Sequence, residues 1–195
     1  MSTRFQRRHS LSTIAAVTVA LGAMLGAAGA SAQATSPAST ASAPRAAHAD
    51  SSFLKNAAEA NFAEINAANI ALKKGVSADV KAFAQKMIDD HKKADSDLQN
   101  LASSKGVKLP TEATMVQKGK EKLLEQRDGT SFDHHYAENQ VNAHKDAVKL
   151  FEKASKDAKD ADVKAWAAKM LPALQQHLTE AQALETATKA ADKKK

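Results

Sequence analysis

Four titratable side chains occupy core-facing positions of the sequence: one carboxylate, Glu64, and three imidazoles, His91, His144 and His177. At 100° per residue, each falls on the apolar face of its own expected helix. Carboxylate oxygens and imidazole nitrogens are ligands of first-row transition metals, and the chain has no cysteine to supply a thiolate. The set therefore predicts one metal ion (Fe, Mn, Zn or Cu) in the bundle core, with Asp133 as a candidate supporting residue.

Two other interpretations of the same residues stay open. Buried polar side chains are most often hydrogen-bonded core residues, so these four could form a polar layer that fixes the helix register. Imidazoles also titrate in the pH range that an exported protein meets, so the layer could be a pH sensor. In either case the bundle would be a structural or protein-interaction module whose protein partner is unknown.

Four long helices are expected to position these residues. Ala, Lys, Glu, Gln and Leu dominate the periodic segments, and Gly and Pro are nearly absent from them. The expected ranges are about 53–74, 77–105, 132–157 and from 160 onwards. Ser51 and Ser52, Ser77, and Asp160 are candidate N-caps, and Gly75 is a stop signal.

The lengths of the connections predict the topology. The turns at 75–77 and 158–160 are short, so the helices on either side of each turn should form antiparallel hairpins. The connection over 106–131 is too long for a turn, and a minor helix is expected at about 111–126. Two antiparallel hairpins joined by such a crossover form an all-α, ferritin-like four-helix bundle.

A repeated segment supports two related hairpins. Ala78–Met87 reads ADVKAFAQKM and Ala161–Met170 reads ADVKAWAAKM, with eight identities in ten at an offset of 83. The copies diverge before the candidate site, because Leu174 occupies the position that matches His91. Any site should therefore have been built separately on each half.

The positions of the four side chains along the bundle axis depend on the crossover. Within each hairpin, the two side chains should be offset by only ~4.5 Å along the bundle axis. An up-down-down-up order of the helices would leave the pair of Glu64 and His91 about two turns away from the pair of His144 and His177.

The N-terminal sequence predicts export. Arg4, Arg7 and Arg8 precede an apolar run, Leu11–Ala30, and Ala30-Ser31-Ala32 fits a cleavage site, so the mature protein should begin at Gln33 in the periplasm. No transmembrane span is expected in the mature protein. The expected organisation is a signal peptide (1–32), a flexible Ala/Ser/Pro-rich tether (33–50), the bundle domain (51–188) and a Lys-rich tail (189–195).

Charge and motifs exclude several classes of function. The net charge is +6, and it falls to about +3 once the three arginines of the leader are removed. Acidic and basic residues are interleaved, without the basic stripe and stacking aromatics of nucleic-acid binding. There is no nucleophile–base pair and no Gly-rich phosphate loop, so nothing predicts an enzyme.

These residues resemble a known family. Glu64, the run KAFAQKMIDDH at Lys81–His91, Leu109-Pro110, FDHHY at Phe132–Tyr136, His144, and LPALQQH at Leu171–His177 are similar to domain-of-unknown-function family 4142. The resemblance covers about 52–184 and implies an exported, ferritin-like protein.

The ferritin-like resemblance implies carboxylate-bridged di-iron chemistry in some relatives, but this chain departs from that pattern. Di-iron bundles use a Glu-x-x-His pair on two helices, with a further Glu from each of the others. Three residues before the three core histidines stand Ile88, Val141 and Leu174, which are all apolar. A mononuclear site, or none, fits the sequence better than a di-iron centre.

Overall fold

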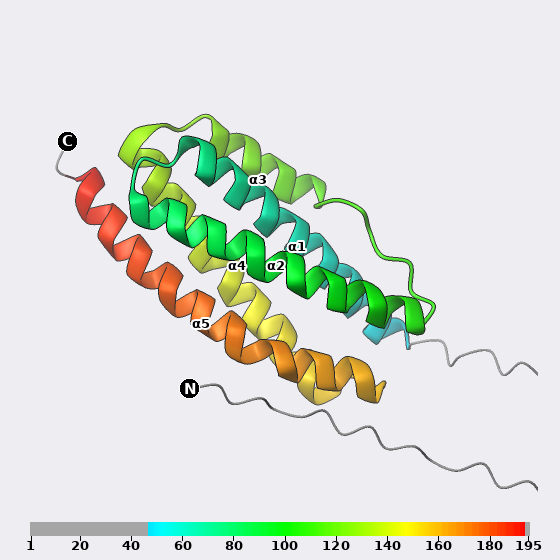
Figure 1. The fold of residues 1–195 in the computed structure, drawn as a ribbon. Helices are drawn as coiled ribbons and strands as arrows, with labels where there is room; N and C mark the ends of the chain where they lie inside the picture. Colours follow the sequence, from blue (N-terminus) through cyan, green and yellow to red (C-terminus); the bar gives the residue numbers. More distant parts are fainter. Residues whose placement is uncertain (1–46, 194–195) are drawn as a thin grey trace, which may run out of the picture. The chain divides into compact units, whose positions relative to one another are not determined.

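The bundle is described by a computed structural model that covers residues 47–193. The expected leader and nearly all of the expected tether lie outside the described residues. Within 47–193 the chain is all-helical, as the sequence predicted, and contains no strand (Figure 1). The helices are α1 (His48–Lys74), α2 (Ala78–Ser104), α3 (Met115–Glu125), α4 (Gly129–Asp157) and α5 (Ala161–Asp192).

The helix ends agree with the predicted caps at two of three places. The Ser77 side chain accepts a hydrogen bond from the backbone of Asp79, and Asp160 caps α5 in the same way. The expected cap at Ser51 and Ser52 was wrong, because both residues lie inside α1, which begins at His48. The first residues of α1 thus fall in the segment expected to be tether, and α5 continues to Asp192, beyond the expected end of the bundle.

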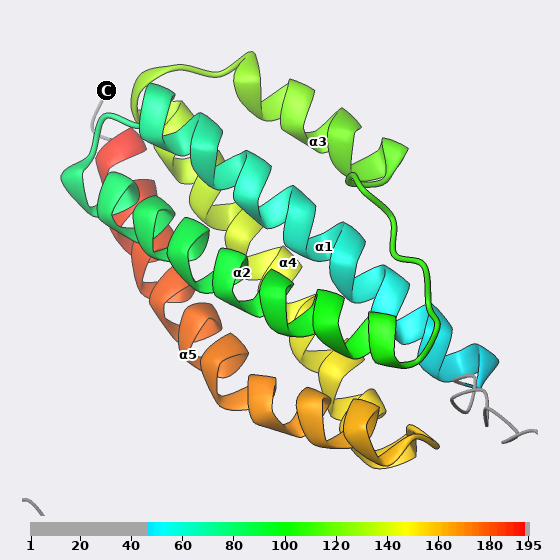
Figure 2. The same ribbon diagram turned by 45° about the vertical axis from the view of Figure 1, so that its right-hand side comes forward.

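The chain reverses at opposite ends of the bundle. The 75–77 turn joins α1 to α2 at one end, and the 158–160 turn joins α4 to α5 at the other (Figures 1 and 2). The main contacts are between α1 and α2 and between α4 and α5, and α1 also packs against α4. The short helix α3 belongs to the crossover that leads from the end of α2 to the start of α4. It packs on the outside of α1 and α4 (Figure 2).

The core consists of two hydrophobic clusters at different levels of the bundle. The cluster towards the 75–77 turn includes Phe83, Met87, Phe132 and Tyr136, and the other includes Phe53, Leu98, Phe151 and Trp166. On each long helix, the change from one cluster to the other falls at buried polar residues. These polar positions are Asn61 and Glu64 on α1, His91 on α2, Gln140 and His144 on α4, and His177 on α5.

A buried aspartate holds each of the two turns from across the bundle. Asp133 of α4 accepts hydrogen bonds from the backbone N–H groups of Val76 (3.0 Å) and Ser77 (2.8 Å). There is little room for a side chain at the start of this turn, because a Cβ at Gly75 would lie 2.7 Å from the carbonyl oxygen of Ala71 and 2.9 Å from Cγ1 of Val80. Only glycine fits there without a shift of neighbouring atoms.

The second turn is held in the same way. Asp50 of α1 accepts hydrogen bonds from the backbone N–H groups of Lys159 (3.1 Å) and Asp160 (2.8 Å). Asp50 and Asp133 are related by the offset of 83 that relates the repeated segments. The repeat therefore extends from the sequence to a pair of tertiary contacts, which we call the aspartate clasps.

None of the helices in the described part of the chain is long and apolar enough to cross a bilayer.

Candidate metal centre

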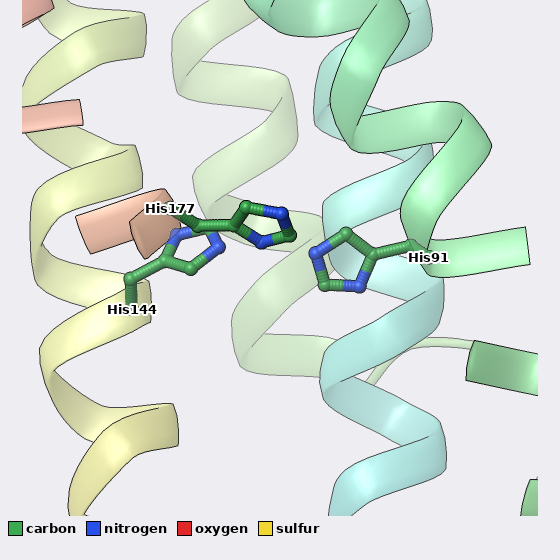
Figure 3. Close-up of side chains that lie close together, drawn as sticks. All are labelled: His91, His144 and His177. Carbon is green, nitrogen blue, oxygen red and sulfur yellow. The ribbon is translucent and has the colours of Figure 1, made fainter. Parts of the chain in front are cut away.

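Three buried histidines from three helices meet between the two hydrophobic clusters. His91 (α2), His144 (α4) and His177 (α5) each contribute a ring nitrogen, and these nitrogens lie within 4.8 Å of one another. The ring centroids are 5.4–5.9 Å apart, and the residues are only 8%, 1% and 4% exposed. Figure 3 shows the three rings gathered around a common point. We call this group the histidine cluster.

The positions of the two turns explain why the cluster forms. His91 lies 14 residues after Ser77, and His144 lies 14 residues before Ala158. At ~1.5 Å per residue, each is roughly 21 Å from its own turn, which is about half the length of these helices. Because the turns are at opposite ends, the two residues meet at mid-height. The sequence left open whether the side chains of the two hairpins fall in one layer, and the stagger of two turns expected for an up-down-down-up order is absent for the three histidines.

Two of the rings are fixed through their Nδ1 atoms. Nδ1 of His91 lies 2.8 Å from Oδ1 of Asn61, and Nδ1 of His144 lies 2.9 Å from the backbone oxygen of Gln140. Both partners are acceptors, so each Nδ1 carries the proton and donates it. The lone pair of each of these neutral rings is therefore on Nε2.

The third ring is fixed through its other nitrogen. Nε2 of His177 lies 2.9 Å from a carboxylate oxygen of Asp90, so it donates to that carboxylate and leaves the lone pair on Nδ1. Although partial burial alone would raise it, the pKa of Asp90 is lowered by hydrogen bonds from Lys86 and His177. Asp90 therefore remains an anionic partner for this ring.

The inward nitrogens have no such partners. Nε2 of His91, Nε2 of His144 and Nδ1 of His177 are buried and make no hydrogen bond to any described residue. A polar group that is buried without a partner carries a desolvation cost of about 1–3 kcal/mol. Rings that are anchored at one nitrogen and free at the other are the usual arrangement of metal-binding histidines.

Burial disfavours the charged form of His91 and of His177. Desolvation lowers the pKa of His91 to about 3, and the neighbouring His144 and His177 lower it further by repulsion. Burial also lowers the pKa of His177. A neutral imidazole is the form that binds a metal ion, so these rings need not lose a proton first.

Glu64 lies outside the histidine cluster. Its Oε2 accepts a hydrogen bond of 2.7 Å from Nε2 of Gln140, which is one turn before His144 on α4. Burial raises the pKa of Glu64, although the nearby His144 and the bond from Gln140 oppose this shift. Of the four predicted ligands, the structure thus brings together the three histidines, and the carboxylate pairs with an amide beside them.

The suggestion that Asp133 supports the site was wrong. Helical periodicity placed Asp133 on the same face as His144, but it lies eleven residues earlier, near the start of α4. Its two carboxylate oxygens bind the 75–77 turn.

Three residues that orient the cluster were not predicted: Asn61, Asp90 and Gln140. Gln140 lies on the expected core face of its helix, but a neutral amide there gave no reason to single it out. Asn61 had a usable signal, because the offset of 83 aligns it with His144. Asp90 had none, since it lies on the exposed side of α2, next to Asp89 in the sequence.

Comparisons with known proteins agree with the fold. A family model described as a domain of unknown function (DUF4142) matches residues 35–184, as the resemblance in the sequence indicated. Curated proteins gave no match. The crystal structure of a DUF305 fragment from Deinococcus radiodurans is similar, with a TM-score of 0.66 and 10% identity over 73% of this chain and 99% of that one. A conserved hypothetical protein from Mycobacterium tuberculosis has a TM-score of 0.57 and 20% identity over 71% and 92%.

Proposed function

We propose that this chain, which belongs to the DUF4142 family, is an exported helical bundle that binds one transition-metal ion through His91, His144 and His177. The observation that carries the proposal is that the two nitrogens of each ring have different surroundings. One nitrogen is held by an acceptor, and the other is buried without a partner and turned towards the remaining two rings. Imidazole ligands suit Zn, Cu or Fe better than Mn.

The two alternative functions explain less of the geometry. In a polar layer that only fixes the helix register, buried nitrogens should be paired with one another or with other side chains. A pH sensor needs a histidine that changes charge near neutral pH, and His91 does not supply one, because burial lowers its pKa to about 3. The three free nitrogens are accounted for by a shared ion.

A ferritin-like class of bundle is part of the same proposal. It is supported by the pairing of α1 with α2 and of α4 with α5, and by the long crossover that carries α3. The site within it differs from a di-iron centre, because three imidazoles replace the set of carboxylates.

Export to the periplasm rests on the leader sequence. The basic residues, the apolar run and the small-x-small site of residues 1–32 support cleavage before Gln33. N-terminal sequencing of the protein recovered from the periplasmic fraction of cells expressing the full chain tests this. Protein that stays in the cytoplasm with its leader attached would contradict it.

Metal content is the direct test of the site. Protein purified without chelator or affinity tag should contain close to one equivalent of metal by mass spectrometry of the digested sample. The double variant His91→Ala, His177→Ala should lose it, because a single imidazole cannot hold the ion. His134→Ala should retain the metal and serves as the control, since His134 lies outside the cluster.

The same experiment has a clear negative result. An ion at 100 times its dissociation constant stabilises the folded state by about 2.7 kcal/mol, which a thermal melt detects easily. Metal-free wild-type protein whose melting temperature does not rise with Zn, Fe, Mn or Cu would refute the proposal.

A further inference from the structure

A cavity adjoins the histidine cluster and is large enough for a small organic molecule. Its volume is about 700 Å³, and all three histidines are among its lining residues. Ligand sites for small molecules are typically 300–1,000 Å³ and mostly apolar. Most of the surface of this lining is apolar as well, and Ala57, Ala94, Leu98, Ala147 and Met170 contribute to it.

Three protein ligands leave an ion with a free coordination position. Zinc sites closed by four protein ligands are structural, whereas sites with three keep a position for water or substrate. His91, His144 and His177 supply three ligands, and Glu64, whose Oε2 accepts from Gln140, is not among the residues whose ligand atoms converge. The cavity therefore offers a ligand direct access to the proposed ion.

The unpartnered polar atoms in the lining indicate what such a ligand carries. Nδ2 of Asn61 and Nε1 of Trp166 are buried donors without an acceptor among the described residues, and both residues line the cavity. Oε1 of Gln140 is a buried acceptor of the lining that has no donor among the described residues. The carboxylates of Glu64 and Asp90 also belong to the lining, so the acceptor oxygens of a ligand would have to lie at the ion and at these donors.

We propose, on the basis of the proposed metal site, that the cavity binds a medium-chain monocarboxylate. Its carboxylate takes the free position on the ion and accepts from Asn61, and its apolar tail lies among the alanine and leucine side chains. The lining also includes exposed charged residues, among them Lys93 of α2 and Lys169 of α5. Lys169 is paired with Asp97, so these surface charges are mixed and selection depends on the interior.

The test compares three probes on the Co(II)-loaded full chain: octanoate, acetate and 1-octanol. Titration calorimetry gives the affinities, and the visible absorption of Co(II) reports any change of ligand at the ion. Octanoate should bind at least tenfold more tightly than acetate, because each buried methylene contributes about 0.8 kcal/mol. Octanoate should also change the Co(II) spectrum, and 1-octanol should leave it unchanged.

Two variants separate the tail from the head of the ligand. Ala147→Leu fills part of the cavity and should weaken octanoate at least tenfold while the metal content stays at one equivalent. Ala165→Leu, at an exposed position outside the cavity, is its control. Asn61→Asp keeps an oxygen acceptor for His91 but removes the Nδ2 donor, and it should weaken octanoate several-fold without affecting 1-octanol, even if Ala147→Leu does not fold.

The outcomes distinguish this inference from the proposed function. Protein that binds Co(II) but not octanoate overturns the carboxylate site and leaves the metal site intact. Octanoate that binds equally well to metal-free protein overturns the placement of its carboxylate on the ion. Protein that binds no metal overturns both proposals.

Discussion

The outer nitrogens of the three histidines are held by partners of different charge. His91 and His144 are held by neutral oxygens, whereas His177 is held by a carboxylate. A carboxylate on the outer nitrogen makes the inner nitrogen a stronger ligand than a neutral acceptor does. Asp90 should therefore matter more for metal affinity than its half-exposed position suggests.

Removal of Asp90 tests this. Asp90→Ala should weaken metal binding 10- to 100-fold, because His177 loses the partner that fixes its tautomer and orientation. The matched control is Asp89→Ala, since Asp89 is adjacent and exposed and its carboxylate binds Gln85 on the surface. Competition with a chromophoric chelator gives both affinities, and equal values for the two variants would show that Asp90 has no such role.

The buried imidazole of His91 also predicts how the metal-free protein responds to acid. Because its pKa in the folded state is about 3, the unfolded chain binds a proton at this residue below pH 6.5 and the folded protein does not. Stability should therefore fall as the pH drops from 6.5 towards 3, by up to ~1.4 kcal/mol per pH unit, or about 2 kcal/mol by pH 5. Urea unfolding of metal-free protein measures this dependence.

A variant isolates the contribution of His91 to the pH dependence. His91→Leu cannot gain a proton in either state, so its stability should change less between pH 6.5 and 5 than that of the wild type. The same pH dependence in both proteins would mean that other groups cause the loss.

At the level of the elements, the aspartate clasps fix the two hairpins to each other. Asp133 belongs to α4 but binds the turn of the first hairpin, and Asp50 belongs to α1 but binds the turn of the second. Each carboxylate satisfies backbone N–H groups at the start of a helix, where a negative charge is also favourable. The clasps thus set how far one hairpin can slide along the other.

Loss of either clasp should destabilise the bundle by similar amounts. Asp50→Ala and Asp133→Ala each leave two backbone N–H groups without their acceptor, at a cost of about 2–3 kcal/mol in the free energy of unfolding. Asp146→Ala, at an exposed position of α4, should change it by less than about 0.5 kcal/mol. Denaturant titration of the three variants checks this, and clasp variants as stable as Asp146→Ala would contradict it.

Local signals explain which helix boundaries could be predicted from the sequence. Ser77 and Asp160 bond to backbone groups two or three residues ahead, so sequence spacing alone identifies them as caps. The start of α1 could not be predicted in this way. Its first turn contains Asp50, whose partners lie 109 and 110 residues away in the sequence.

The same distinction applies to the site. Periodicity put the three histidines on core faces, which needs only the position of each residue within its own helix. Whether they meet depends on where the two turns lie relative to each other, and that is set by the crossover. The partners of the rings are set by side-chain directions across helices, so Glu64 could not be separated from the ligands in advance.

At the level of the whole molecule, the two hydrophobic clusters lie at different heights along the bundle axis, and neither belongs to a single hairpin. Both hydrophobic clusters take residues from α1, α2, α4 and α5, and the polar positions lie between them on every long helix. Neither hairpin therefore has a core of its own. We expect folding to require both hairpins at once.

Fragments of the chain test this expectation. Peptides covering 47–107 and 108–193, each with one hairpin, should show little helix by far-UV circular dichroism when separate and regain it when mixed. A single fragment with native helix content and a sharp thermal transition would contradict it.

The origin of the three ring nitrogens has a further consequence. His91 comes from one hairpin, and His144 and His177 come from the other, so an ion bound to them joins two parts of the chain separated by the crossover. Many exported proteins restrict their unfolded chain with disulfides, and this chain has no cysteine. A covalent link between positions 91 and 144 would remove about 4 kcal/mol of chain entropy from the unfolded state. The ion would serve this protein as a reversible cross-link, made and broken by metal supply instead of by redox conditions.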